Sequence, residues 1–267
     1  METTDKDVLS AQGIRKYLAP DCAMIRPEIF PVLDSTNRKV REQAAAGEPE
    51  GYTAIALQQT AGRGRRGHHF HSPAGTGIYM SLLLRPADYI ARDASRLTVM
   101  AAVAACETIE TVSGKKALIK WVNDIFVNGK KAAGILTEAS FSVESGLPEY
   151  AVLGIGINAL EPDGGFPDEI RDIAGAVFDG PATDGKNRLA AEFLNRFTAY
   201  YRARQDAGLY SRYRERCFVI GRTVQVRSAN GNRTAKVLDL DDDFRLIVEY
   251  ENGEKEALIS GELSVRI

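Results

Sequence analysis

A segment that alternates glycine with arginine offers the first chemistry. Residues 62–67 read Gly-Arg-Gly-Arg-Arg-Gly and directly follow Gln58-Gln59-Thr60-Ala61. Glycines let backbone N–H groups approach an anion closely, and guanidinium groups bind phosphate or carboxylate through paired hydrogen bonds. The segment lacks the Gly-Lys-Ser/Thr ending of a Walker loop and does not open a helix as a Rossmann fingerprint does. It predicts an anion-binding loop, with a solvated basic turn or an RNA-binding patch as the alternative.

A second segment joins a polar strand end to a lysine. Residues 120–124 (Lys-Trp-Val-Asn-Asp) precede residues 130–138 (Lys-Lys-Ala-Ala-Gly-Ile-Leu-Thr-Glu). Asn128-Gly129 lies between these strand-like runs and is a strong hairpin signal, because both residues tolerate positive φ. Such a hairpin returns Lys131 to the sheet, where a compact cation can neutralise a reacting phosphate or carboxylate. Alternatively, Asn123-Asp124 only caps a turn and the lysines are surface charges.

A third segment places glycines inside a strand. Residues 154–158 read Gly-Ile-Gly-Ile-Asn within a buried run. A glycine in a strand interior indicates that a ligand or another backbone approaches closely. Tight packing of the sheet is an equally good explanation.

In this order and separation, the three segments resemble the biotin–protein ligase family, over about residues 28–160. The family signatures are Gly-Arg-Gly-Arg-x-Gly, Lys-Trp-Pro-Asn-Asp with a downstream Lys-x-x-Gly-Ile-Leu, and a Gly-x-Gly-x-Asn strand. Residues 261–266 resemble the closing segment of that family. Two positions depart from the pattern, because Val122 stands where proline is usual and Phe70 where tryptophan is frequent.

The resemblance implies roles for individual residues. The residues that match its biotin site are Ser35, Thr36, Gln59, Arg63, Arg65, Lys131, Gly134, Ile135 and Gly154. The residues that match its nucleotide side are Arg66, Phe70, Asn123, Asp124 and Asn158, with Glu262 and Arg266 toward the nucleotide and the acceptor. Arg65 and Lys131 are the two expected to act in catalysis. Plain structural roles are the alternatives: Ser35 as a helix cap, Gln59 as a surface residue and Asp124 as a hairpin cap.

The resemblance also implies a reaction and a fold. Biotin attacks the α-phosphate of ATP, with magnesium, to give biotinyl-5′-AMP, and a lysine of a biotin carboxyl carrier protein domain then takes the biotin. The expected fold class is α+β, with a class II aminoacyl-tRNA synthetase-like catalytic domain built on a mixed sheet over residues 1–217. A small β-barrel follows over residues 218–267. No residue need be a covalent nucleophile, so the three cysteines are expected to be dispensable.

The elements that position these residues are predicted from hydrophobic periodicity. Helices are expected over residues 8–18 (weak), 35–46, 92–111, 167–173 (short), 186–204 and 209–216. Strands are expected over residues 53–58, 77–84, 118–121, 125–127, 132–137 and 150–158. After residue 217 come short alternating strands with turns between them, over residues 223–227, 233–238, 245–250 and 256–259. That pattern is typical of a small β-barrel.

Composition narrows the function classes. The 267 residues are 44% hydrophobic and 26% charged, and 34 basic against 36 acidic residues leave a net charge of −2. This balance lacks the broad positive field of a nucleic-acid-binding protein. The polar first residues do not resemble a signal peptide, and the longest apolar run, residues 99–106, is too short for a bilayer. We expect a cytoplasmic protein, monomeric or homodimeric, that binds neither nucleic acid nor membrane.

Histidine and cysteine usage predicts no metal site. The histidines are His68, His69 and His71, and adjacent residues on an extended segment point in opposite directions. No cysteine or acid stands close in sequence, which favours a polar loop over a zinc site. Cys22, Cys106 and Cys217 are widely spaced and odd in number, so a reducing compartment is the simpler interpretation.

Two rival functions remain. A lipoate–protein ligase shares the implied fold and a key lysine, but the Gly-Arg-Gly-Arg-Arg-Gly loop argues against it. A nucleic-acid-binding regulator is the second, because some relatives carry an N-terminal DNA-binding domain. The first 30 residues are too few for such a domain, and the resemblance is to the form without one.

Overall fold

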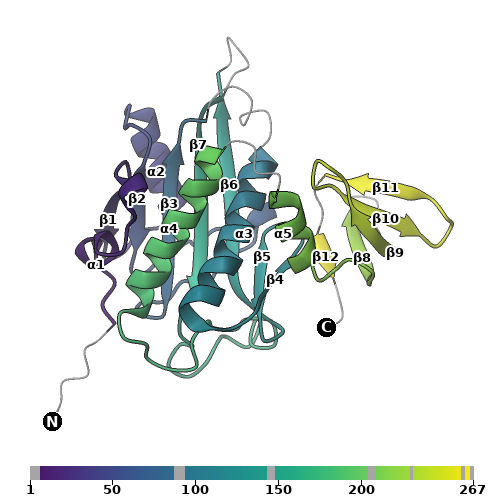
Figure 1. The fold of residues 1–267 in the computed structure, drawn as a ribbon. Coiled ribbons are helices and arrows are strands. Elements are labelled where there is room, and N and C mark those ends of the chain that lie inside the picture. Colours follow the sequence, from purple (N-terminus) through teal and green to yellow (C-terminus); the bar gives the residue numbers. More distant parts are fainter. Residues whose placement is uncertain are drawn as a thin grey trace.

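The chain folds around two β-sheets whose strands are mostly antiparallel. The computed structural model describes residues 7–86, 94–142, 148–203, 208–228, 231–259 and 262–264. A seven-stranded sheet with helices on both faces forms the larger part, and a five-stranded sheet follows near the C-terminus (Figure 1). The predicted α+β class is confirmed. Among the described residues, no helix has the length and apolarity that a bilayer crossing requires.

The larger sheet is mixed, as predicted. Its order is β1 (Arg26–Phe30), β2 (Tyr52–Ala56), β3 (Gly77–Leu84), β7 (Pro148–Asn158), β6 (Lys130–Phe141), β5 (Asp124–Val127) and β4 (Ala117–Lys120). β1 runs parallel to β2, and the other neighbours are antiparallel. Between β5 and β6, Asn128 (φ 51°) and Gly129 (φ 76°) form the predicted hairpin turn.

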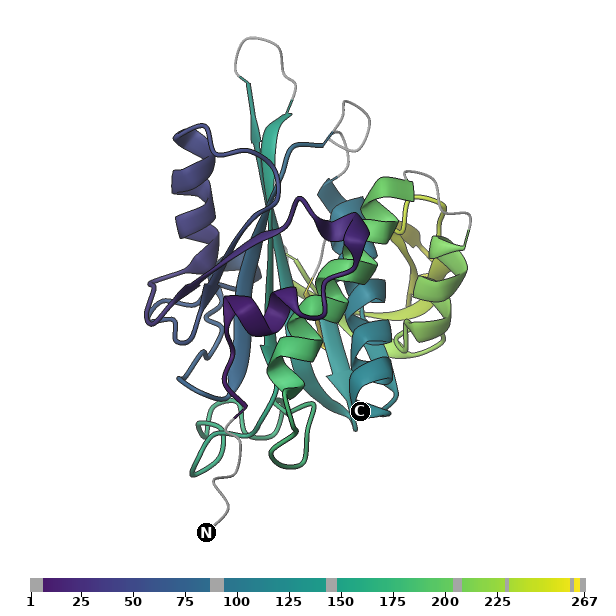
Figure 2. The same cartoon turned by 60° about the vertical axis from the view of Figure 1, so that its left-hand side comes forward.

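Helices cover the two faces unequally. The helices are α1 (Ala11–Arg15), α2 (Thr36–Ala45), α3 (Ala94–Ser113), α4 (Gly185–Ala203) and α5 (Leu209–Arg216), with short 3₁₀ turns η1 (Pro20–Cys22) and η2 (Arg65–Gly67). α1, α3 and α4 lie on one face, and α2 lies on the other (Figures 1 and 2). Alanines dominate the buried side of α3, so this helix packs closely on the sheet.

Strand alternation gives the sheet two different faces. On β7, Leu153, Ile155 and Ile157 belong to the large hydrophobic core that includes α3 and α4. Successive side chains of a strand point to opposite faces, so Gly154 and Gly156 lie on the α2 side. The core face is therefore filled by large apolar side chains, while the α2 face is left nearly bare at this point.

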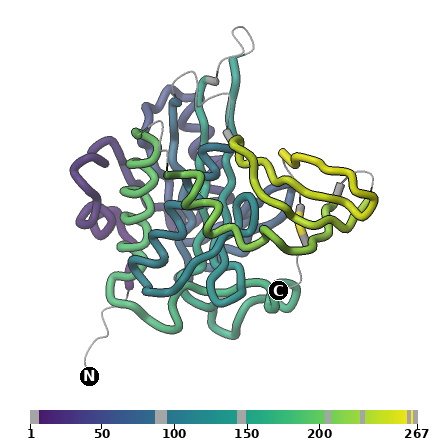
Figure 3. Tube along the Cα trace, turned by 45° about the vertical axis from the view of Figure 1, so that its right-hand side comes forward, coloured from purple at the N-terminus to yellow at the C-terminus, as the bar shows by residue number. Residues whose placement is uncertain are grey.

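The smaller sheet docks beside β4 and α5. Its order is β11 (Lys255–Leu258), β10 (Leu246–Tyr250), β9 (Gly231–Leu240), β8 (Thr223–Ser228) and β12 (Glu262–Ser264), all antiparallel. Figure 3 shows it projecting from the main body. The Trp121 indole N–H donates to Phe244 O at 2.9 Å, and the Tyr213 ring meets Phe244 edge-on. The exact residue at which one part ends and the other begins stays a prediction.

Some predicted elements need correction. Residues 167–173 form a series of hydrogen-bonded turns rather than a short helix. β1 was not predicted, because its Arg-Pro-Glu-Ile-Phe sequence does not alternate. The expected strand over residues 53–58 is shorter, and the first two residues of the helix expected over 92–111 lie outside the described ranges.

The Trp121–Phe244 hydrogen bond yields a stability prediction. Both groups are buried, and Trp121→Phe removes the donor while leaving the Phe244 carbonyl without it. We expect the free energy of unfolding to fall by about 1–3 kcal/mol. Urea unfolding followed by far-ultraviolet circular dichroism measures it, with Phe218→Leu as a packing control at the same junction. An unchanged unfolding midpoint for Trp121→Phe would contradict the assignment.

Candidate active site

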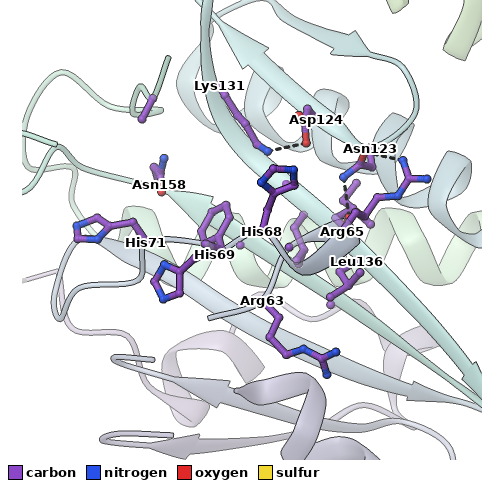
Figure 4. Close-up of a pocket in the computed structure, with 18 of the residues that line it drawn as sticks. Arg63, Arg65, His68, His69, His71, Asn123, Asp124, Lys131, Leu136 and Asn158 are labelled. Carbon is purple, nitrogen blue, oxygen red and sulfur yellow. Dashed lines mark hydrogen bonds and ion pairs between the residues drawn. The ribbon is translucent and has the colours of Figure 1, made fainter. Parts of the chain in front are cut away.

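One cavity of about 350 Å³ collects the predicted residues. It is lined by Arg63, Arg65 and Arg66 from residues 62–67, called the arginine loop below, and by Lys131 from β6. These four cations come from two stretches far apart in sequence, and Figure 4 shows Arg65 and Lys131 on two sides of the same hollow. The volume lies within the range of small-molecule sites. The cavity therefore offers concentrated positive charge in a partly enclosed space.

The arginine loop is an ordered hairpin. The Phe70 N–H donates to Gly62 O at 2.9 Å, and the Gly64 N–H donates to His68 O at 2.6 Å. Arg63 and His69 form an isolated antiparallel bridge between them. The turn at η2 is tight, with Arg66 at φ 54° and Gly67 at φ 81°. The loop thus presents its arginines from a fixed backbone.

Arg65 is held toward the interior by a neutral partner. Its guanidinium Nη1 donates to Asn123 Oδ1 at 3.1 Å, and Asn123 Nδ2 donates to Ile135 O at 2.9 Å. Burial lowers the pKa of Arg65 and the neighbouring Arg66 lowers it further, while Asp124 acts in the opposite direction. A buried cation that donates to a neutral amide is poised to accept an anion, because an anion would offset its lost hydration.

Lys131 lines the same cavity from β6. Its ammonium forms an ion pair with Asp124 at 2.7 Å, which Figure 4 marks by a dashed line. Backbone bonds from Lys131 N to Ile173 O and from Gly175 N to Lys131 O fix the strand against residues 173–175. Asp124 therefore orients the ammonium from β5, beyond any role as a hairpin cap.

The floor of the cavity is made of glycines. Gly134 of β6 and Gly156 of β7 are register partners. A Cβ on Gly156 would lie 2.4 Å from the Phe70 ring, and a Cβ on Gly134 would lie 3.4 Å from it. The Phe70 ring therefore occupies the space that a side chain at position 156 would need, and it lies close to Gly134. Phe70 also contacts Tyr79 edge-on, so phenylalanine keeps an aromatic packing role here.

A polar cluster of Ser35, Thr36 and Gln59 lines another part of the cavity. Gln59 Oε1 accepts from Thr36 N at 2.9 Å and from Thr36 Oγ1 at 3.2 Å. Ser35 precedes α2, but its side chain makes no capping hydrogen bond. Both Ser35 and Thr36 are buried and line the cavity. The alternatives of a helix cap and a surface glutamine therefore do not describe Ser35 and Gln59.

The remaining predicted residues fall into two groups. Asn158 lines the cavity and donates from Nδ2 to Gly175 O at 3.1 Å. Ile135 lines it, although its side chain belongs to the core cluster. Glu262 belongs to β12, and the next residue, Leu263, lines the cavity. Arg266 lies outside the described residues.

Several lining residues were not predicted. Asn37 follows Ser35-Thr36 directly, so its place at the start of a helix was a usable signal. Phe166, Ile170, Ile173 and Ala174 come from the turn-rich segment, where periodicity gives no orientation. Leu263 reaches the cavity from the smaller sheet, a contact between distant segments that a single sequence does not reveal.

Metal-binding groups are few. Within the described ranges, no group of three or more His, Cys, Asp or Glu side chains could hold a metal ion. His68, His69 and His71 line the cavity, and burial, followed by the proximity of His69, lowers the pKa of His71. Asp124 is the one carboxylate among the described lining residues, and Lys131 already engages it.

The cysteines are buried away from this chemistry. Cys22, Cys106 and Cys217 are unpaired, buried and absent from the cavity lining. Burial raises the pKa of all three thiols, that of Cys217 to about 12. The reactive thiolate form of these groups is therefore scarce at pH 8.

These thiols should therefore resist modification in the folded protein. We expect a chromogenic disulfide reagent at pH 8 to titrate none of the three rapidly, and all three after denaturation in guanidinium. Absorbance against time measures both rates. Rapid release of one equivalent from the native protein would contradict the burial of the thiols.

Two protein-family models match the chain. The model described as the biotin/lipoate A/B protein ligase family covers residues 29–158, which include the arginine loop, Lys131 and the glycine floor. The model described as the biotin protein ligase C-terminal domain covers residues 219–266, the region of the smaller sheet.

Curated relatives match over most of their length. The bifunctional ligase/repressor BirA of Bacillus subtilis is 38% identical over 232 residues, which is 84% of this chain and 69% of that protein. The biotin–[acetyl-CoA-carboxylase] ligase of Mycobacterium tuberculosis is 30% identical over 223 residues, 80% of each protein.

Solved structures share the fold. The biotin protein ligase from Aquifex aeolicus in complex with biotin and ATP superposes with a TM-score of 0.75 at 23% identity, over 90% of this chain and 98% of that one. The family models, the extent of the sequence matches and the shared fold agree: this chain belongs to the biotin protein ligases of the biotin/lipoate A/B protein ligase family.

Proposed function

We propose that the protein is an ATP-dependent biotin–protein ligase. The biotin carboxylate attacks the α-phosphate of ATP, the bond to the β-phosphate breaks, and biotinyl-5′-AMP and pyrophosphate form. The ε-amine of an acceptor lysine then attacks the acyl carbon, the amide forms, and AMP leaves with the electron pair of the broken acyl–oxygen bond. A carboxylate is a poor electrophile, and AMP converts it into a good one.

The observation that carries the proposal is the meeting of Arg63, Arg65, Arg66 and Lys131 around one cavity. Two anions, a carboxylate and a triphosphate, must be brought together for the first step, and their mutual repulsion opposes it. Fixed cations in a partly enclosed site offset that repulsion and stabilise the charge that develops on the phosphate oxygens. Lys131 is assigned to the reacting carboxylate and α-phosphate, and Arg65 to the adenylate phosphate.

The two ends of the cavity suit the two parts of the adenylate. Ser35, Thr36 and Gln59 offer hydrogen-bonding groups to the polar ring end of biotin, and Gly134 and Gly154 line the same cavity. Phe70, Asn123, Asp124 and Asn158 are assigned to the nucleotide side, with Arg66. Glu262 and Arg266 stay proposals for the side that faces the acceptor.

Biotin is favoured over lipoate as the acid. The C-terminal match is to a biotin protein ligase domain, and the relatives described above are named as ligases for biotin or as BirA. The compact polar cluster at Thr36 and Gln59 suits an acid that carries hydrogen-bonding groups at its far end. Lipoic acid has only a dithiolane ring there.

Magnesium is assigned to the nucleotide. With Asp124 engaged by Lys131, the described residues fit a metal that arrives on the ATP phosphates rather than one held by the protein alone. Magnesium usually binds through substrate phosphates and water with one or two carboxylates. Mg·ATP is therefore the substrate form.

The acceptor is assigned as a biotin carboxyl carrier domain. The name of the Mycobacterium tuberculosis relative, a ligase for acetyl-CoA carboxylase, supports this choice. A cytoplasmic location is proposed with it, because unpaired cysteines suit a reducing compartment.

Formation of the adenylate tests the function directly. We expect the protein, incubated with Mg·ATP and equal concentrations of biotin and lipoic acid, to release pyrophosphate and to accumulate biotinyl-5′-AMP but not lipoyl-AMP. Mass spectrometry of the bound small molecules distinguishes the two products. Lipoyl-AMP as the main product would reassign the substrate. If neither adenylate formed, the proposed function would be wrong.

Charge removal at the two assigned positions separates their roles. We expect Lys131→Ala to slow biotinyl-AMP formation about a hundredfold or more, because a fixed charge at the developing anion is lost. We expect Arg65→Ala to form the intermediate but to hold it about tenfold more weakly, because a charge-assisted hydrogen bond is lost.

Lys130→Ala is the matched control. Lys130 is adjacent to Lys131, exposed, and absent from the cavity lining. Single-turnover adenylate formation and the rate of adenylate release, measured by rapid filtration, report the two effects. Equal losses in Lys130→Ala and Lys131→Ala would refute the assignment of Lys131.

A further inference from the structure

Glu138 is a carboxylate that lies outside the cavity lining yet contacts two residues within it. It follows Gly134 and Leu136 at every second position of β6, so it points to the same α2-side face. Its Oε2 accepts from Asn37 Nδ2 at 2.8 Å, and its Oε1 lies 3.3 Å from Arg63 Nη1. Neither the motifs nor the proposed chemistry gives Glu138 a role.

The Glu138 carboxylate, together with the Leu136 carbonyl that accepts from Asn37 Nδ2 at 3.3 Å, fixes the orientation of the Asn37 amide. An ionised carboxylate only accepts hydrogen bonds, so the Nδ2 group of Asn37 must face Glu138 and its Oδ1 must face the other way. Oδ1 lies 2.6 Å from the Ser81 hydroxyl, which is fully buried. A Cβ on Gly154 would lie 2.0 Å from the same Oδ1. The close approach of Asn37 therefore explains why position 154 has no side chain.

The contacts continue from Ser81 to the polar end of the cavity. The Ser81 hydroxyl also lies 2.7 Å from Thr36 Oγ1, and its single hydrogen serves either Thr36 or Asn37. Because Asn37 Oδ1 can only accept, it competes for that hydrogen. When Asn37 takes it, the Thr36 oxygen keeps its acceptor capacity for a ligand N–H.

The same contacts lead back to the arginine loop. Thr36 bonds to Gln59, and Gln59 Nε2 donates to Ser72 Oγ at 3.0 Å. Ser72 Oγ donates to Phe70 O at 2.8 Å, at the end of the loop hairpin. Arg63, at the other side of that hairpin, pairs with Glu138. Both strands of the loop are thus tied to one polar network.

We propose that Glu138 is a positioning residue that couples the docking of Arg63 to the hydrogen-bonding state of Thr36, so that the arginine loop and the biotin-ring site are set by one carboxylate. The inference rests on the proposed function, since biotin is the acid assigned to this end of the cavity. Its physical content is preorganisation: the loop and the hydroxyl are ordered before the ligand arrives, which lowers the cost of binding.

Arg41 supplies a matched control. Its Nη1 lies 3.9 Å from the same Oε1 atom of Glu138, and its side chain is 41% exposed against 47% for Arg63. Arg41 is absent from the cavity lining, whereas Arg63 belongs to it. Removing the charge of either arginine takes a cation away from Glu138, but only the change at Arg63 also breaks the contact between Glu138 and the arginine loop.

The test is biotin affinity without nucleotide, measured by isothermal titration calorimetry. We expect Glu138→Gln to raise the biotin Kd about tenfold, because a charge-assisted acceptor is lost, and Arg63→Met to raise it about threefold. The double variant should be no weaker than Glu138→Gln alone, since both changes break the same link. Arg41→Met should stay within about twofold of the wild type.

Steady-state kinetics separate positioning from general damage. We expect Glu138→Gln to raise the KM for biotin while the KM for ATP and kcat at saturating biotin stay unchanged, the pattern of lost uniform binding. A merely structural role would weaken ATP and biotin together. If Glu138→Gln does not fold, Asn37→Ser cuts the same network at its next member and should raise the KM for biotin alone.

The outcomes are distinguishable. Wild-type biotin affinity in Glu138→Gln, multiplicative losses in the double variant, or equal losses in Arg41→Met and Arg63→Met would each overturn the coupling while leaving the ligase function intact. A wild-type protein that binds no biotin would overturn the proposed function, and this inference with it.

Discussion

Holding like charges close together is the constraint on which this structure depends. Arg63, Arg65, Arg66 and Lys131 are among the cationic side chains that line one cavity, and their mutual repulsion must be offset by the fold until anionic substrates arrive. The protein meets this in two ways. Lys131 of β6 forms an ion pair with Asp124 of β5, whereas Arg65 donates a hydrogen bond to the neutral amide of Asn123. Lys131 is oriented by an opposite charge. Arg65 donates to a neutral group, and its burial, which lowers its pKa, favours the binding of an anion beside it.

The scaffold makes this possible through strand alternation. One face of β6 and β7 is anchored in the large core, which fixes the backbone, and the other carries glycines that leave space for a ring and a ligand. Because both properties belong to the same strands, the rigidity of the core is passed to the cavity floor without any intervening loop. The hairpin that carries the arginines then needs to be fixed only at its two ends.

Much of this could be predicted from sequence, because the informative signals are local. Asn128-Gly129 specified a hairpin that brings Lys131 back, and Gly-Ile-Gly-Ile-Asn marked a bare strand face. The long helices followed from periodicity. What could not be predicted depends on contacts between distant segments: the edge strand β1, the turns of residues 167–173, the approach of Leu263, and the pairing of Glu138 with both Asn37 and Arg63. A single sequence gives each of these residues a type but no neighbour.

The position of Trp121 has a practical consequence. This sole tryptophan lines the cavity, and its indole N–H reaches across to the backbone of the smaller sheet. Indole emission responds to the polarity and hydrogen bonding of its surroundings, so one native chromophore reports on two separate events. Filling of the cavity changes the environment of its side chain, and separation of the two sheets exposes its N–H to water. The molecule thus carries its own optical probe at the junction of its two parts.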